Sequence, residues 1–388
     1  MTEIAHGTVA PLPGEAILSR WWRTVDKVTL GCLLTLFAVG ILLGLAASVP
    51  LAERNGLRPF HYVERQLVFG VMAFAVMAVA SAMSPTAIRR LGVLGFVGAF
   101  VAVALLPVLG TDFGKGAVRW YSLGFASLQP SEFLKPVFVI LTAWLMAASH
   151  APHGPPGKTI SAAITVVILA FLALQPDFGQ AMLTLVAWSS IYFVAGAPIA
   201  LLTGVVAAVV LVGLFAYHNS EHFARRIDGF LNPEIDPRTQ LGYATDAIRE
   251  GGIFGTGVNE GQVKWNLPDA HTDFIVAVAA EEYGLVMVLF ITALFATVTL
   301  RCLMRLTRER DLFCRLAGTG LTVLFAAQAF VNLGVAVRLL PAKGMTLPFV
   351  SYGGSSLVAM GALTGMLLAF TRTRPQNDIG DHLLRGAR

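Results

Sequence analysis

The sequence has little charge and few cysteines. Only 13% of its 388 residues are Asp, Glu, Lys or Arg, and 56% are hydrophobic, whereas about 25% of a typical globular protein is charged. This composition excludes a water-soluble domain. The three cysteines, Cys32, Cys302 and Cys314, show no CxxC spacing, so they are predicted to be packing residues and indicate neither a disulfide framework nor a zinc site.

Several catalytic motifs are also missing. The chain has no G-x-x-x-x-G-K-[ST] phosphate loop, no HExxH, no nucleophile elbow and no dinucleotide fingerprint. Its net charge is +5, but it has no basic run with interleaved aromatic residues, so nucleic acid is not an expected partner. Without a nucleotide site, an energy-rich substrate has to arrive through the membrane phase.

Apolar runs of membrane-spanning length fill most of the chain. About 20 apolar residues cross a bilayer, and runs bounded by charge, Gly or Pro predict ten crossings. They cover residues 28–49, 67–83, 91–109, 131–148, 160–174, 181–195, 201–217, 274–298, 316–337 and 351–370. The predicted fold class is an all-α membrane protein, a polytopic bundle of ten transmembrane helices with one long extracytoplasmic loop. The fifth and sixth runs are short, which leaves a tight hairpin or a re-entrant pair as the alternative there.

The two sides of the predicted bundle differ in charge. Lys and Arg are in excess on the side that holds both termini, and the other side is nearly neutral, so the positive-inside rule makes the termini cytoplasmic. The predicted organisation is a cytoplasmic leader (1–27), helices one to seven (28–217), a large periplasmic loop (218–272), helices eight to ten (273–371) and a cytoplasmic tail (372–388). Apolar anchors such as Phe230 and Trp265 favour an ordered, functional loop over a disordered one.

Ionisable residues near helix ends indicate where function lies, because charge at membrane depth is costly. Glu132 and Lys135 follow Pro130 at the start of the fourth span and lie three apart, on one helical face. A structural ion pair that orients this helix is one interpretation. A polar wall of an outward-facing substrate cavity is the other.

A second polar group stands directly before the eighth span, which is predicted as an uninterrupted apolar helix. It consists of Asp269, His271, Thr272 and Asp273. Asp273 falls at the first helical turn, where a helix cap or an interaction with the helix dipole is the ordinary role of an acid. The neighbouring His271 and Thr272, together with the long loop that leads here, favour a reacting site.

A third group enters the last span. It covers residues 340–356, in which Pro348 and the glycine pair at 353–354 predict a bent or broken helix entry. Such an entry is tolerated at membrane depth only where the backbone is buried in protein or lines a wet cavity. Lys343 is a candidate phosphate contact, although a solvated loop lysine is the commoner case. Gln328 and Asn332, four apart in the ninth span, are predicted to join helices by hydrogen bonds.

These motifs, taken together, resemble the FtsW/RodA (SEDS) family. The matching stretches follow the family's order over nearly all of the membrane region: 114–120, 129–132, 175–177, 271–274, 281–284 and 343–356. Residues 261–264 and 267–270 are more similar to the division branch, FtsW, than to the elongation branch, RodA. Tyr283 stands where Phe or Leu is more usual, a change not expected to affect the chemistry.

The resemblance implies a ten-helix inner-membrane peptidoglycan glycosyltransferase that polymerises lipid II beside a class B penicillin-binding protein transpeptidase. It places the functional acid on Asp273 and makes Glu132 and Lys135 line the same cavity. The implied partners are lipid II, the nascent glycan strand, the transpeptidase, other division proteins and membrane lipid. The implied location is the plasma membrane of a bacterium, at the division septum.

The mechanism predicted from the residues agrees with this resemblance. Asp273 is expected to deprotonate the acceptor 4-hydroxyl, while Lys135, Arg119 or Lys343 holds the pyrophosphate, alone or with a divalent cation such as Mg or Mn. The remaining candidate substrate-binding residues are His271, Thr272 and Ser351. An elongation-type polymerase, a lipid II flippase and a scaffold that recruits a synthase are the alternatives.

Overall fold

The structure is a computed structural model that describes residues 17–112, 118–124, 126–196, 199–219, 221–231, 239–341 and 344–373. These residues form mostly helix, with one short hairpin in which β1 (Tyr121–Ser122) pairs antiparallel with β2 (Ser127–Leu128). The helices are α1 (Ile17–Thr24), α2 (Lys27–Arg54), α3 (His61–Ala82), α4 (Pro85–Leu109), α5 (Pro130–Ala148), α6 (Gly157–Leu174), α7 (Phe178–Val194), α8 (Ile199–Asn219), α9 (Glu221–Leu231), α10 (Gln240–Gly251), the 3₁₀ turn η1 (Val263–Trp265), α11 (Ile275–Leu306), α12 (Leu312–Ala336) and α13 (Gly354–Thr371).

The predicted fold class, an all-α polytopic membrane protein, is confirmed. Within the described part of the chain, eight helices are long and apolar enough to cross a membrane, namely α2 to α6 and α11 to α13. A ninth is counted if α8 and α9, which meet at a bend of 107°, form one span, and α7 is shorter, with 17 residues. Each of the ten predicted ranges falls on one helix, but the count of ten stays a prediction.

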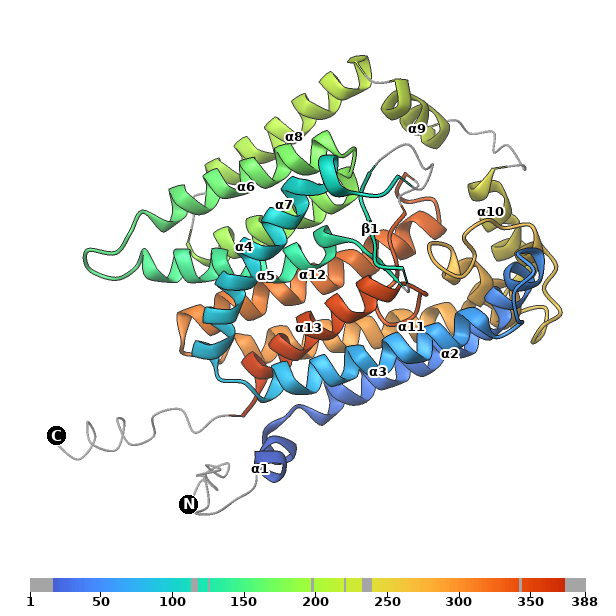
Figure 1. Ribbon diagram of the computed structural model, residues 1–388, viewed down its shortest axis with the longest axis horizontal. Coiled ribbons are helices and arrows are strands. Elements are labelled where there is room, and N and C mark those ends of the chain that lie inside the picture. The colour runs from blue at the N-terminus through green and yellow to red at the C-terminus, as the bar shows by residue number, and fades with distance from the viewer. Residues whose placement is uncertain are drawn as a thin grey trace.

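The helices run side by side, with α1 at one end of the bundle and α10 at the other (Figure 1). The most buried spans are α13, α5 and α12, which form the centre of the bundle. Close packing there depends on small residues, as is usual between membrane helices. Gly361 and Gly365 of α13 leave no room for a Cβ atom, because they lie against the backbone of α3 at Ala73 and Met77.

The prediction of an uninterrupted eighth span was wrong. α11 is broken at Gly284, whose φ of 72° is a conformation that other residues rarely adopt. The backbone amides freed by the break are bound by a segment of the long loop, since Leu285 N donates to Gly252 O at 3.0 Å and Val286 N to Ile253 O at 3.3 Å. A break in a membrane helix requires such internal partners. α11 also runs to Leu306, beyond the predicted end at 298.

The long loop predicted over 218–272 is ordered where the structure describes it. It contains α9, α10 and η1, and η1 leads into the turn before α11. The last residues of α2 approach this region, because Arg54 Nη2 donates to Trp265 O at 2.5 Å. The loop therefore covers the end of the bundle at which α11 begins.

Candidate active site

A cavity of about 700 Å³ opens at the end of the bundle where α5, α7, α11 and α13 begin. Its volume lies within the 300 to 1,000 Å³ that is usual for small-molecule sites. Most of the lining is polar: Arg65, Phe69, Arg119, Trp120, Ala126, Ser127, Gln129, Glu132, Pro176, Asp177, Phe178, Gly179, Gln240, Asp269, His271, Thr272, Asp273, Gly344, Met345, Thr346, Tyr352, Gly353, Gly354, Ser355 and Ser356. Loops and helix ends far apart in the sequence therefore share one polar chamber.

Asp273 lines this cavity from a tight turn before α11. Its backbone N–H donates to Asp269 O at 3.1 Å, and Asn332 Nδ2 of α12 donates to its carbonyl oxygen at 3.0 Å. The N-cap of α11 is Phe274, which makes no side-chain cap hydrogen bond. The N-cap position of α11 is thus occupied by Phe274 and not by Asp273.

Gly344 keeps the space beside this carboxylate open. A Cβ atom at residue 344 would lie 3.1 Å from Asp273 Oδ2. Asn332 also donates to Met345 O at 2.6 Å, so one side chain joins the turn before α11 to the entry of α13. Asn332 was predicted to join helices, and it links α12 to the two non-helical segments that lead into α11 and α13.

His271 and Thr272 lie in the same turn and both line the cavity. The His271 ring is buried against Tyr62 and Tyr352, with centroid separations of 5.2 and 5.5 Å. Its carbonyl oxygen accepts from Tyr352 N at 3.0 Å. His271 therefore shapes the cavity wall by aromatic packing and by its backbone as well as by its imidazole.

Glu132 and Lys135 form the ion pair that their spacing predicts, with 2.9 Å between Nζ and Oε2. Both side chains are buried, and each has a second partner. Gln180 donates to Glu132 Oε1 at 2.5 Å, and Lys135 Nζ donates to Gln328 Oε1 at 2.9 Å. Only Glu132 lines the cavity, so the structure places Lys135 one layer behind the wall.

Arg119 lines the cavity beside the turn between α6 and α7. Its Nε donates to Gln175 O at 3.0 Å and its Nη2 to Pro176 O at 2.7 Å. The adjacent Asp177 is buried, which raises its pKa despite the nearby Arg119 guanidinium. In this corner of the cavity, the Arg119 guanidinium therefore lies near the Asp177 carboxyl group, which keeps its proton to a higher pH than an ordinary Asp does.

Besides Lys135, two further predicted residues are not placed in the cavity. Ser351 is buried, and its Oγ accepts from Leu347 N at 2.9 Å, so it stabilises the turn before α13. Lys343 lies outside the described residues, as do the first positions of the 114–120 motif. The predicted bent entry is present, because residues 344–353 are not α-helical and α13 begins only at Gly354.

Sequence reasoning missed several cavity residues. Arg65 of α3 adds a second cation to the lining, and Ser356 Oγ lies 2.7 Å from Thr346 Oγ1 at the start of α13. Arg65 precedes the predicted span at 67–83 by two residues, and a basic residue at the edge of an apolar run was the available signal. Its proximity to Asp273 depends on tertiary packing, which the sequence does not display.

The described residues contain no cluster of three or more His, Cys, Asp or Glu side chains suited to a metal ion. Asp269 and Asp273 both line the cavity, however. One or two carboxylates together with substrate phosphates are a usual environment for Mg²⁺. Asp269 and Asp273 are therefore oxygen ligands of the kind that such an ion binds.

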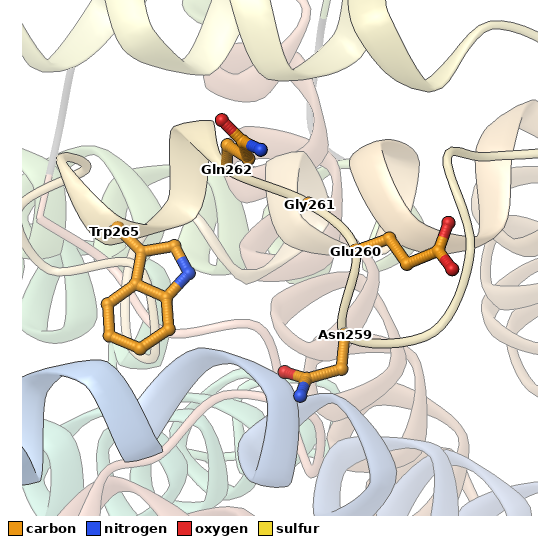
Figure 2. A pocket seen from close by; sticks show the side chains of 5 residues that line it. All are labelled: Asn259, Glu260, Gly261, Gln262 and Trp265. Atoms are coloured by element: carbon orange, nitrogen blue, oxygen red, sulfur yellow. The ribbon is translucent and has the colours of Figure 1, made fainter.

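A second hollow of about 680 Å³ lies on the long loop, over residues 259 to 265 (Figure 2). Trp265 and Asn259 project from the loop toward the same gap in this view, and the other lining residues are Glu260, Gly261 and Gln262. None of these five is a cation. The larger cavity is the better candidate active site, because it combines carboxylates with two arginines.

Comparisons with known sequences identify the family of this chain. The FtsW/RodA/SpoVE family model, described as "Cell cycle protein", matches residues 26–376. A probable peptidoglycan glycosyltransferase FtsW of Caulobacter vibrioides (strain NA1000 / CB15N) is 40% identical over 360 residues, which cover 92% of each chain. A protein of the same description from Trichlorobacter lovleyi is 34% identical over 362 residues, 88% of this chain and 92% of that one.

Solved structures show the same architecture. A chain from work headed "Structural coordination of polymerization and crosslinking by a peptidoglycan synthase complex" is 28% identical with a TM-score of 0.75, over 91% of this chain and 99% of that one. The rod shape determining protein RodA of Thermus thermophilus is 25% identical with a TM-score of 0.66, over 90% and 97%. Since the family model and the FtsW relatives span most of the sequence, this chain belongs to the FtsW/RodA/SpoVE family.

Proposed function

We propose that this chain is a peptidoglycan glycosyltransferase that polymerises lipid II into glycan strands during septal wall synthesis. The observation that carries the proposal is the placement of Asp273 in a polar cavity that Arg65 and Arg119 also line. A carboxylate suits the deprotonation of a sugar hydroxyl, and arginines suit a departing diphosphate. The FtsW descriptions of the relatives support the reaction class and the division role.

The reaction transfers a glycan from one lipid carrier to a new acceptor. Asp273 accepts the proton of the acceptor 4-hydroxyl as its oxygen forms a bond to C1 of the donor chain. The bond between C1 and the diphosphate oxygen breaks, and the electron pair leaves with undecaprenyl pyrophosphate. Arg119 and Arg65 stabilise the negative charge that develops on this leaving group.

The buried ion pair serves this chemistry indirectly. Glu132 faces the cavity and Lys135 holds it from behind, through the contact of 2.9 Å. Lys135 therefore positions Glu132 and does not itself bind the diphosphate. A divalent cation, Mg²⁺ or Mn²⁺, would enter with the diphosphate and be held by Asp269 while Asp273 acts as the base.

Further proposals concern the surroundings of the enzyme. Its partner is a class B penicillin-binding protein, supported by the similarity to a chain of a peptidoglycan synthase complex. The enzyme acts at the division septum with other division proteins, in the bacterial inner membrane, with both termini in the cytoplasm. The excess of Lys and Arg on the side of the termini supports this orientation.

The test is polymerisation of fluorescent lipid II by the purified chain together with its transpeptidase partner. Asp273→Ala should lower the rate by about 10² to 10⁴-fold, the usual contribution of a general base. The variant should elute as folded protein and keep its partner. Glu64→Gln, an exposed carboxylate at the same end of the bundle, is the matched control and should retain full activity. Polymer of normal length from Asp273→Ala would overturn the assignment.

A further inference from the structure

A cluster of buried charges joins the long loop to the first half of α11. Val263 N and Lys264 N donate to the two carboxylate oxygens of Glu281 at 2.7 and 3.0 Å. Lys264 Nζ forms an ion pair with Glu282, and it donates to Asn259 Oδ1 at 3.1 Å. Lys264, Glu281 and Glu282 are here called the Lys264 cluster.

The reaction does not use the Lys264 cluster directly. None of its members lines the cavity that contains Asp273, and their exposed fractions are 2% for Lys264, 0% for Glu281 and 1% for Glu282. Three buried ionisable groups carry a large desolvation penalty, and apolar residues of similar volume often stabilise a fold as well or better. Net stabilisation of the fold is therefore a weak explanation of their presence.

The backbone around the cluster is equally confined. Thr256 N donates to Glu281 O at 2.8 Å, directly beside the break at Gly284. Gly261 lies so close that a Cβ atom there would be 2.7 Å from the carboxyl carbon of Glu281. The loop, the break in α11 and the acidic pair thus fit together as one closely packed unit.

A short stretch of chain connects the Lys264 cluster to Asp273. The segment from residue 264 to residue 273 begins in the cluster and ends directly before α11. Glu281 and Glu282 lie on α11 between its start and the break at Gly284. The segment is therefore fixed at both of its ends to one short piece of helix. Asp273 lies at the end of this segment that adjoins α11, and only Phe274 separates it from the first residue of the helix, Ile275.

We propose that the Lys264 cluster is a positioning device for Asp273. By holding residues 263 and 264 against Glu281 and Glu282, it fixes where the turn at 269–274 presents its carboxylate in the cavity. Misplacement of a catalytic group by about 1 Å can cost about 10²-fold in rate. The inference rests on the proposed polymerase function and adds the residues that control the geometry of its base.

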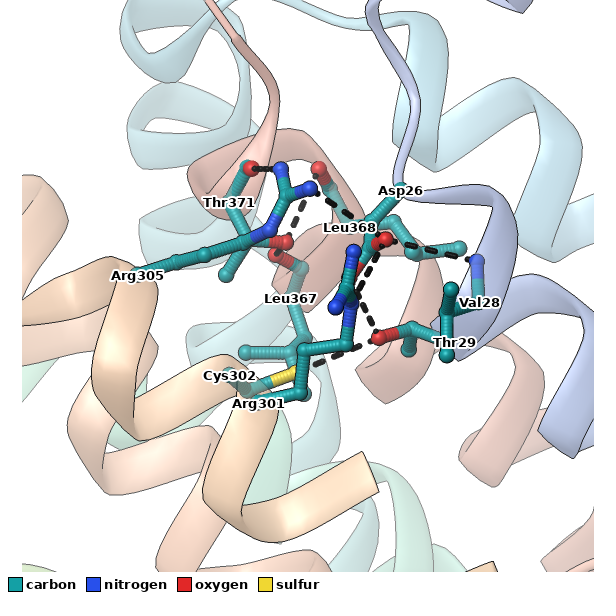
Figure 3. Close-up of polar contacts among 9 residues, drawn as sticks. All are labelled: Asp26, Val28, Thr29, Arg301, Cys302, Arg305, Leu367, Leu368 and Thr371. Atoms are coloured by element: carbon teal, nitrogen blue, oxygen red, sulfur yellow. Dashed lines mark hydrogen bonds and ion pairs between the residues drawn. The ribbon is translucent and has the colours of Figure 1, made fainter. Parts of the chain in front are cut away.

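The opposite end of α11 offers a matched control. Asp26, whose side chain is 1% exposed, pairs with Arg301 at 2.7 Å and with Arg305 at 3.3 Å, and it lies far along α11 from the cavity (Figure 3). Asp26→Asn and Glu282→Gln each remove one buried negative charge that pairs with a basic residue at one end of α11. Only the second is expected to affect the base.

The experiment measures kcat and KM for lipid II with the full chain and its transpeptidase partner. Glu282→Gln and Lys264→Met should each lower kcat by about 10-fold or more, with KM changed by less than about 3-fold, because the substrate contacts remain. The double variant should be no worse than either single variant, since both remove the same interaction. Asp26→Asn should keep the kcat of the folded protein.

Gly261→Ala serves if Glu282→Gln does not fold. It retains every charge and displaces the Glu281 carboxylate, so kcat should again fall without a matching change in KM. The inference is overturned if folded variants of the Lys264 cluster keep kcat within about 2-fold, or if Asp26→Asn lowers kcat equally. A wild-type chain that does not polymerise lipid II would instead contradict the proposed function.

Discussion

The two ends of α11 both hold buried charges, and they differ in what lies beside them. At one end, the Lys264 cluster holds the segment that leads to Asp273, which lines the polar cavity. At the opposite end, Asp26 pairs with Arg301 and Arg305, and none of these three residues lines that cavity. Buried charge alone therefore does not identify a functional site in this bundle. The decisive feature is a short stretch of chain, residues 264 to 273, that connects the buried charges to a residue lining the polar cavity.

The Asp26 cluster instead joins helix ends. Asp26 caps α2 and accepts from Thr29 Oγ1 at 2.8 Å, while Arg305 Nη1 donates to Thr371 O at the end of α13 at 2.9 Å (Figure 3). Three spans that are distant in sequence are thereby held in register. The nearby Cys302 thiol, 4.0 Å from Thr29 Oγ1, is buried among these contacts.

The largest expected loss of stability belongs to the ion pair at the cavity end. Lys135→Met leaves Glu132 as an uncompensated buried charge, which typically costs about 3 to 5 kcal/mol in the free energy of unfolding. Equilibrium unfolding in detergent micelles measures this loss. A second variant, Lys135→Met with Glu132→Gln, should recover part of it. A loss below about 1 kcal/mol for the single variant would show that the pair is well hydrated.

A smaller loss is expected from Asp26→Asn at the opposite end. A hydrogen bond to a charged group is worth about 1.5 to 3 kcal/mol. Arg301 and Arg305 are 35% and 31% exposed, so water compensates them partly and the lower end of that range applies. The free energy of unfolding should therefore fall by about 1.5 kcal/mol. A loss as large as that of Lys135→Met would remove the contrast between the two ends.

The Asp26 cluster also predicts a pH dependence. Burial raises the pKa of Asp26, but hydrogen bonds from Arg301 and Thr29 and the charge of Arg305 outweigh it, so the pKa lies below the ordinary value of 3.8. A carboxyl group with a lowered folded-state pKa stabilises the fold above its unfolded pKa, and this contribution is lost as the pH falls through the folded value. The stability difference between wild type and Asp26→Asn should be constant near neutral pH and shrink below pH 3.8.

Much of the bundle was predictable because apolar runs of about 20 residues have few other fates. The Glu132–Lys135 pair was predictable for a similar reason, since residues three apart share a helical face. The sequence did not reveal the break at Gly284, because one glycine in an apolar run is compatible with a continuous helix. The break depends on loop residues 252–257, which pack there only in the folded chain.

The cavity also contains residues that were predictable from the sequence and residues that were not. Asp273 and His271 were predictable from a polar motif ahead of an apolar run, whereas Arg65 joins them only because α3 packs against α13. The family resemblance placed Lys135 in the cavity, and Ser351 was a candidate substrate-binding residue, yet both make internal hydrogen bonds outside the cavity lining. The motifs in the sequence therefore indicate which segments form the cavity, but they do not show which of their side chains line it.

The smallest effect is expected from the exposed ion pair between Arg58 and Glu64, whose atoms are 2.8 Å apart. Their side chains are 76% and 51% exposed, so the pair gains little in water and is screened by salt. Glu64→Gln should change the free energy of unfolding by less than about 1 kcal/mol, less again at high ionic strength. Unfolding at low and high salt measures both quantities. A larger loss that does not depend on salt would contradict this prediction. It would mean that the contribution of a charge to the free energy of unfolding depends on its proximity to the cavity and not on its burial.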